Sequence, residues 1–74
     1  MKREPVAVTT PFIKLDAFLK FCGAAETGGH AKLLVMEGEV KVGGEICTQR
    51  GKKLYPGTVV TLGDREFEVV AGED

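Results

Sequence analysis

The chain has 74 residues, of which 43% are hydrophobic and 28% are charged, and it contains no Trp. A chain of this length forms one small domain and buries only ~60% of the surface that its unfolded form exposes. This composition argues against disordered and fibrous classes, and a net charge of −1 argues against a protein that coats nucleic acid by bulk charge alone.

The first third of the chain predicts an edge strand and then a helix. Residues 6–10 are rich in β-branched side chains, which favour an edge strand that Pro11 ends. A helix is expected to open after Pro11 and to stop at Gly23. Its apolar stripe follows the i, i+3, i+4, i+7 spacing and consists of Leu15, Phe18, Leu19 and Cys22.

A second helix is expected between Thr27 and Gly38. Thr27 is a suitable N-cap residue, and Gly38 ends the helical pattern. Its short apolar stripe consists of Ala31, Leu34 and Val35, with Leu33 and Met36 beside it. Because both helices are short and joined by a brief turn, we expect a helical hairpin. The aromatic side chains expected in the core are Phe12, Phe18, Phe21 and Phe67.

The remainder of the chain predicts short strands separated by turns. Strands are expected at residues 39–42 and 45–48 around a Gly43-Gly44 turn, followed by a basic loop at 49–53. Two further strands are expected at residues 59–62 and 65–69, after turns at 55–58 and 63–64. We therefore predict an α+β domain over residues 1–74, in which a two-helix hairpin precedes a small, mostly antiparallel sheet.

The charges are divided along the chain. Residues 14–53 carry seven Lys or Arg against five Asp or Glu, whereas residues 64–74 carry one Arg against five acids. The middle of the chain is therefore basic and its end is acidic.

No apolar run approaches the ~20 residues of a bilayer span, which favours a cytoplasmic protein. Cys22 and Cys47 form no C-x-x-C pair, so we expect reduced, buried thiols.

Several short motifs occur together in residues 13–62. They are Lys14-Leu15-Asp16 with Leu19; Thr27, Ala31, Lys32 and Leu34; the run from Glu37 to Val42; and the run from Leu54 to Val60. In this order they resemble the S-four RNA-binding domain, also called the alpha-L motif and named after protein four of the small ribosomal subunit. The closest likeness is to stand-alone bacterial members. The sequence departs from the family's pattern at Gly43, Thr58 and His30, where Asn, Asp and Glu are usual, and His30 alters the surface at the start of the second helix.

The resemblance implies binding to structured RNA, such as ribosomal or transfer RNA, through cations that contact phosphates. It brings Lys14 and Lys32 near the basic loop, and Thr27-Gly28-Gly29-His30 could supply backbone amides to a phosphate at a helix start. The glycines could equally serve only the turn, His30 only the cap, and the loop cations only solvation. The complete set of candidate RNA-binding residues is Lys14, Thr27, Gly28, Gly29, His30, Lys32, Lys41, Arg50, Lys52 and Lys53.

The sequence is also compatible with a second function class and argues against a third. A protein-interaction adaptor could use the same hairpin surface, with Leu33 and Met36 as apolar anchors. An enzyme is disfavoured, because the sequence contains no nucleophile–base pair, metal-ligand cluster or P-loop. Asp16 is expected to make a structural contact early in the first helix. We therefore expect neither a cofactor nor a metal.

Overall fold

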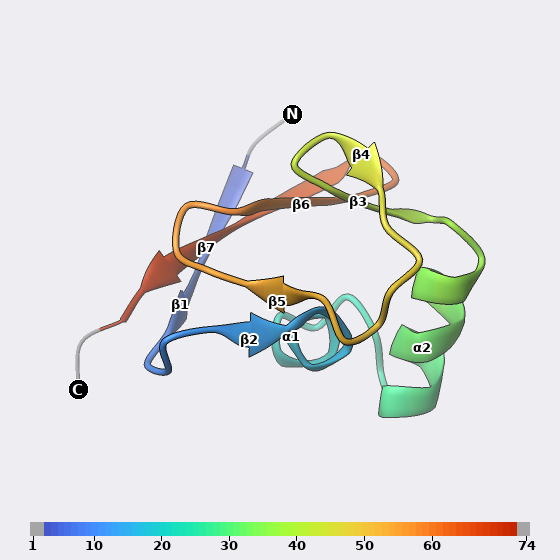
Figure 1. Ribbon diagram of the computed structural model, residues 1–74, viewed down its shortest axis with the longest axis horizontal. Coiled ribbons are helices and arrows are strands. Elements are labelled where there is room, and N and C mark those ends of the chain that lie inside the picture. The colour runs from blue at the N-terminus through green and yellow to red at the C-terminus, as the bar shows by residue number, and fades with distance from the viewer. Residues whose placement is uncertain (1–2, 73–74) are drawn as a thin grey trace.

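The computed structural model describes residues 3–72 and confirms the α+β class (Figure 1). Among the described residues, two strands precede a hairpin of two helices and five strands follow it, and the strand pairs are mostly antiparallel. Glu73 and Asp74, which contribute to the acidic end of the sequence, lie outside the described residues. The elements in chain order are β1 (Arg3–Val8), β2 (Ile13–Lys14), α1 (Leu15–Phe21), α2 (Gly28–Met36), β3 (Val40–Val42), β4 (Glu45–Ile46), β5 (Lys53–Leu54), β6 (Val59–Leu62) and β7 (Arg65–Ala71).

The described strands form two sheets. The larger has the order β1-β7-β6-β3-β4, and its pairs are antiparallel except for the parallel pair β1–β7. The smaller consists of β2 and β5, which pair antiparallel. Figure 1 shows the chain between β4 and β5 crossing from the larger sheet to the smaller one. The expected turn between β3 and β4 is present, and both of its glycines, Gly43 and Gly44, have positive φ, as a tight hairpin turn requires.

One face of the larger sheet packs against the helices. In β7 the side chains alternate, so that Phe67 and Val69 are buried whereas Glu66 and Glu68 are partly exposed, as the period of two predicts. The ring of Phe18, from α1, meets that of Phe67 edge to face, with 6.2 Å between the centroids. Fully burying an aromatic side chain of this kind stabilises a fold by about 1.5–3 kcal/mol, so this contact anchors α1 on the sheet.

Helix α1 starts later than the sequence predicts. Residues 13 and 14 pair with β5 instead of continuing the helix towards Pro11, and the helix begins at Leu15. Its apolar stripe is confirmed, because Leu15, Phe18 and Leu19 are fully buried. The stop at Gly23 is confirmed as well, since this glycine has φ +82°, a conformation that other residues rarely adopt.

The expected burial of Phe21 is wrong. Its side chain is 61% exposed, because it lies off the buried stripe of α1 in the last residue of the helix. Phe18 and Phe67 are in the core as predicted, whereas Phe12 is partly exposed. On α2, Ala31 and Val35 are buried and Leu34 packs against the core from a partly buried position.

Several strand boundaries also differ from the prediction. Strand β1 spans Arg3–Val8 and not residues 6–10, β3 begins at Val40 and not at residue 39, and β7 continues to Ala71. Two further differences lie within residues 46–53. Strand β4 ends at Ile46 and does not reach residue 48, because the chain leaves the larger sheet there. Lys53, predicted in a loop, lies in β5. Both differences have one cause, which is that residues 47–52 connect the two sheets.

Both cysteines are free thiols, as expected, but each is only partly buried. Partial burial raises the pKa of the Cys22 thiol above its ordinary value of 9.0, since a thiolate is poorly solvated there.

Within residues 3–72, no helix has the length and apolar composition needed to cross a membrane.

Candidate functional site

The basic loop, defined here as residues 49–52, is held against the start of α1. The backbone N–H of Leu15 donates to the carbonyl of Lys52 at 2.9 Å, and that of Asp16 donates to the carbonyl of Arg50 at 3.0 Å. The first N–H groups of a helix have no partner within the helix. Lys14, at the N-cap, offers no side-chain hydrogen bond. The loop carbonyls therefore take the place of a capping side chain.

This anchoring fixes the shape of the loop. The N–H of Lys52 donates to the carbonyl of Gln49 at 3.1 Å, which closes a turn with Arg50 at its tip. The carboxylate of Asp16 accepts from the N–H of Ala17 at 2.8 Å, so its role is structural, as the sequence predicts. Because the loop is attached through its backbone, the side chains of Arg50 and Lys52 remain exposed to solvent.

Two lysines lie directly opposite each other in the smaller sheet. Lys14 in β2 is paired with Lys53 in β5, and both side chains are exposed. Like charges at opposed strand positions destabilise the pair. The ammonium of Lys53 also lies 4.8 Å from the centroid of the Phe12 ring, whose own neighbour is Tyr55 at 6.1 Å. This arrangement concentrates positive charge beside the basic loop. We call Lys14, Arg50, Lys52 and Lys53 the basic surface.

The start of α2 presents unused backbone donors. The hydroxyl of Thr27 accepts from the N–H of His30 at 3.0 Å, which confirms Thr27 as the N-cap. In the described part of the chain, the N–H groups of Gly28 and Gly29 have no protein acceptor. Both glycines are exposed, and a methyl group added at Gly28 would meet no heavy atom within 4 Å.

His30 takes part in the cap through its side chain. Its Nδ1 accepts a hydrogen bond from the N–H of Glu26 at 3.3 Å. The arrangement resembles a capping box, except that the side chain of His30 accepts from the residue before the N-cap and that a Glu or Gln normally fills this role. With Nδ1 occupied as an acceptor, the other ring nitrogen of the neutral imidazole is a donor available to a ligand.

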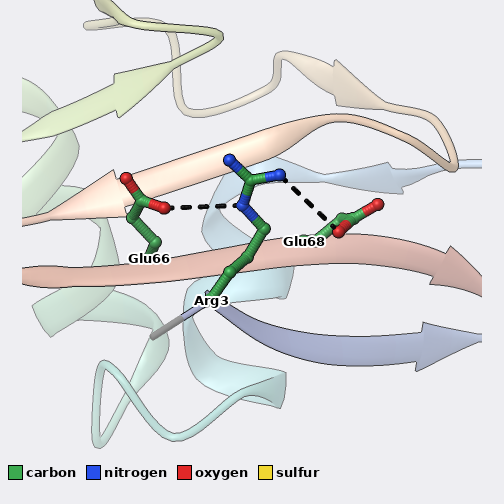
Figure 2. Close-up of polar contacts among 3 residues, drawn as sticks. All are labelled: Arg3, Glu66 and Glu68. Atoms are coloured by element: carbon green, nitrogen blue, oxygen red, sulfur yellow. Dashed lines mark hydrogen bonds and ion pairs between the residues drawn. The ribbon is translucent and has the colours of Figure 1, made fainter. Parts of the chain in front are cut away.

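The ion pairs of the protein lie elsewhere. Arg3, on β1, reaches across β7, where its guanidinium is 3.4 Å from Glu66 and 3.9 Å from Glu68 (Figure 2). Arg65 pairs with Glu4 at 3.4 Å. Among residues 3–72 these are the ion pairs within 4.0 Å, so every member of the basic surface is free of a carboxylate partner. Arg3 and Arg65 thus have carboxylate partners, whereas the four cations of the basic surface have none. The remaining described lysines, Lys20, Lys32 and Lys41, are likewise without one.

The other two predicted cations lie on other elements of the fold. Lys32 is exposed on α2. Lys41 lies in β3, where its register partner in β6 is Thr61. Thr61 in turn faces Glu66, which is on the side of the sheet away from Phe67 and the helices. Lys41 therefore lies on the opposite face of the larger sheet from the helical hairpin.

Comparison with known proteins identifies the family. The family model described as "S4 domain" matches residues 6–70, which is most of the chain. The chain belongs to the S4 domain family. This is the S-four family that the motifs of residues 13–62 resemble, and the match extends beyond them on both sides to include parts of β1 and β7.

Curated relatives of similar length are found in bacteria. The chain is 42% identical over 68 residues to "Probable ribosome maturation protein RlbA" of Bacillus subtilis, covering 90% of this chain and 96% of the relative. It is 36% identical over 61 residues to "Putative RNA-binding protein YbcJ" of Escherichia coli, covering 82% of this chain and 87% of the relative. The similarity therefore spans most of this chain and most of each relative.

In this S4 domain, the structure brings together some of the predicted site residues and not others. Lys14 joins Arg50, Lys52 and Lys53, as the resemblance implied. The contribution of the loop backbone to α1 was missed, because it depends on main-chain carbonyls that carry no side-chain signal. The contact between the partly exposed Phe12 and the exposed Tyr55 was missed too, since the sequence places these residues more than 40 positions apart. Across the described residues, no group of three or more His, Cys, Asp or Glu side chains is close enough to hold a metal ion.

Proposed function

We propose that this S4 domain binds structured RNA through the basic surface and the start of α2. Lys14, Arg50, Lys52 and Lys53 contact the phosphates, and the free amides of Gly28 and Gly29 receive a further phosphate at the positive end of the α2 dipole. Thr27 and His30 hold this helix start, and Lys32 lies on the same helix. Lys41, on the other face of the larger sheet, contributes only long-range attraction.

One observation carries this proposal, namely the opposed and unpaired lysines Lys14 and Lys53. Their repulsion lowers stability in the isolated protein, and no described carboxylate lies within 4.0 Å to offset it. A polyanion bound across both ammonium groups would remove the repulsion. By contrast, Arg3 of β1 and Arg65 of β7 already have carboxylate partners.

Ribosomal RNA is the target class that we favour. The relative from Bacillus subtilis is named for ribosome maturation and the one from Escherichia coli for RNA binding, and both align with nearly all of this chain. A rigid surface with scattered cations suits the regular phosphates and wide minor groove of an A-form helix. Recognition of the paired regions would then depend on shape and not on base sequence.

The test is a comparison of two variants that each lose one positive charge. Arg50→Gln removes a cation of the basic surface, whereas Arg3→Gln removes one that is engaged with Glu66 and Glu68. Binding to a fluorescently labelled ribosomal RNA hairpin would be measured by anisotropy at low salt. We expect Arg50→Gln to weaken binding by about fivefold, as for a lost phosphate contact, and Arg3→Gln to change it by less than about twofold.

The pair is informative because both variants have the same net charge. If affinity fell equally in the two, binding would reflect bulk charge and the basic surface would lose its assigned role. Unfolding curves for both variants would show that the fold is retained, so that a lost affinity can be attributed to the missing charge.

A protein-interaction role is the second candidate, and the exposure of three apolar side chains favours it. Leu33 and Met36 are each 57% exposed on α2, and Ile46 on β4 is 62% exposed. The side chain of Ile46 lies 3.6 Å from where a Cβ of Gly38 would be, which brings it near the end of α2. A pull-down from nuclease-treated lysate separates the two functions, because a partner bound through these residues would be retained after RNA removal, whereas one bridged by RNA would be lost.

A further inference from the structure

A cavity of about 330 Å³ opens on the surface between β4 and the basic loop. Ligand sites in proteins usually measure about 300–1,000 Å³, so this cavity suits a small group and not an extended ligand. Its lining combines apolar and polar side chains, among them Val42, Glu45, Ile46, Thr48, Gln49 and Lys52.

The walls of the cavity are fixed by backbone hydrogen bonds. The N–H of Cys47 donates to the carbonyl of Val40 at 3.0 Å, and the thiol of Cys47 lies 3.7 Å from the carbonyl of Gln49. That same carbonyl accepts from the N–H of Lys52, whose own carbonyl caps α1. A preformed cavity loses little conformational entropy when a ligand enters.

The lining matches the chemistry of a nucleobase. Val42 and Ile46 contribute apolar surface to the lining, and the amide of Gln49 can both donate to and accept from a base edge. Glu45 is the informative residue, because a carboxylate near RNA is unfavourable unless it accepts a hydrogen bond from a donor. The exocyclic amino groups of cytosine, adenine and guanine are such donors, whereas uracil carries no amino group and offers only its ring N3–H.

The cavity is also continuous with the basic surface. Lys52 belongs to both. An RNA backbone that contacts Lys52 on the basic surface would therefore run past the opening of the cavity. Proteins read RNA sequence chiefly from unpaired bases that are splayed out of loops and bulges. We propose that this cavity receives one unpaired nucleotide with an amino-bearing base, next to the helical RNA that the basic surface holds. This inference rests on the RNA binding proposed above.

The experiment compares three RNA hairpins of the same stem. One is fully paired, one carries a single bulged cytidine and one carries a single bulged uridine, which has the same size but lacks the amino group. Binding is measured with the full chain and with Glu45→Gln, Gln49→Ala and the control Glu39→Gln. The control removes the same charge from an exposed residue that does not line the cavity.

We expect the cytidine bulge to bind about five- to tenfold more tightly than the paired stem or the uridine bulge. Gln49→Ala should reduce this preference, and Glu45→Gln should abolish the difference between cytidine and uridine. Glu39→Gln should leave both ratios unchanged. Because ratios between RNAs are compared, any general gain in affinity from losing a negative charge cancels.

The outcomes separate this inference from the proposed function. Equal binding of all three hairpins at measurable affinity would overturn the nucleotide site and leave RNA binding by the basic surface intact. A cytidine preference that survives both Glu45→Gln and Gln49→Ala would also overturn it, since the preference would arise elsewhere. Failure to bind any of the hairpins at low salt would overturn both proposals.

Discussion

The backbone N–H of Asp16 donates a hydrogen bond to the carbonyl of Arg50 at 3.0 Å. This bond joins the start of α1 to a loop 34 residues further along the chain, and the parallel bond from Leu15 to Lys52 reinforces it. The loop thus completes the helix with its main chain while its side chains remain available for a ligand. If RNA binds as proposed, folding and binding use different atoms of the same residues.

This division predicts that the loop's charge can be changed without loss of stability. Replacing Arg50 and Lys52 together by Gln should alter the free energy of unfolding by less than about 0.5 kcal/mol, because both side chains are exposed. Amide hydrogen exchange at Asp16 should stay slow in this double variant. Deleting Gly51 should instead remove the carbonyl acceptors from their places and accelerate exchange there. Slow exchange after the deletion would contradict the capping role of the loop.

The opposed lysines predict that one substitution improves stability and weakens binding. Lys14→Gln removes the repulsion with Lys53 and should raise the free energy of unfolding by about 0.2–0.5 kcal/mol at low salt. The gain should vanish in 1 M salt, where charges are screened within about 3 Å. RNA affinity should fall in the same variant.

Lys20→Gln is the matched control for this experiment. Lys20 is an exposed lysine in the last turn of α1, where a positive charge is favourable to the helix dipole. Its loss should lower stability slightly. A decrease of similar size in Lys14→Gln would mean that the lysine pair is not under strain.

The N-cap of α2 predicts a stability effect that depends on one oxygen atom. Thr27→Ala removes the acceptor of the His30 N–H and should cost about 1 kcal/mol in urea unfolding. Thr27→Ser keeps the hydroxyl and should recover most of that loss. If Ser and Ala were equally destabilising, the methyl group of Thr27 and not its hydroxyl would be responsible.

The raised pKa of Cys22 predicts a loss of stability at alkaline pH. Burial keeps the thiol protonated in the folded chain at a pH where the unfolded chain, with its ordinary pKa of 9.0, releases the proton. Between these two pKa values the unfolded state binds fewer protons, so the free energy of unfolding falls as pH rises through about 9. Below that pH the contribution is complete. Cys22→Ala should show a smaller decline over the same range, and identical declines would show that other groups cause it.

Local features of the fold could be predicted from sequence because neighbouring residues determine them. The buried stripe of α1 follows from the spacing of Leu15, Phe18 and Leu19, and the helix stop follows from the conformational freedom of Gly23. Thr27 was predicted as an N-cap since its hydroxyl lies within one helical turn of the amide that it serves. In β7, the period of two was sufficient to orient Phe67 and Glu66.

Features that depend on distant pairing could not be predicted in this way. Strands β2 and β5 have two residues each and pair across about 40 positions, so neither shows a periodic pattern. Their pairing delays the start of α1 to Leu15 and turns Lys53 from a loop residue into a strand residue. The parallel partner of β1 is β7, at the other end of the chain. The family resemblance supplied Lys14 as a neighbour of the basic loop, which the residues alone did not.

The most direct test of the account is a salt titration of binding to a labelled ribosomal RNA hairpin, with a DNA duplex of equal length beside it. We expect tighter binding to RNA than to DNA and a steep linear fall of log affinity with log salt concentration. Replacing Arg50, Lys52 and Lys53 by Gln should make the slope shallower by about 2–3, as the loss of three phosphate contacts requires. An unchanged slope in that variant, or no binding of either nucleic acid by the wild-type protein at low salt, would contradict the assignment of the basic surface to RNA.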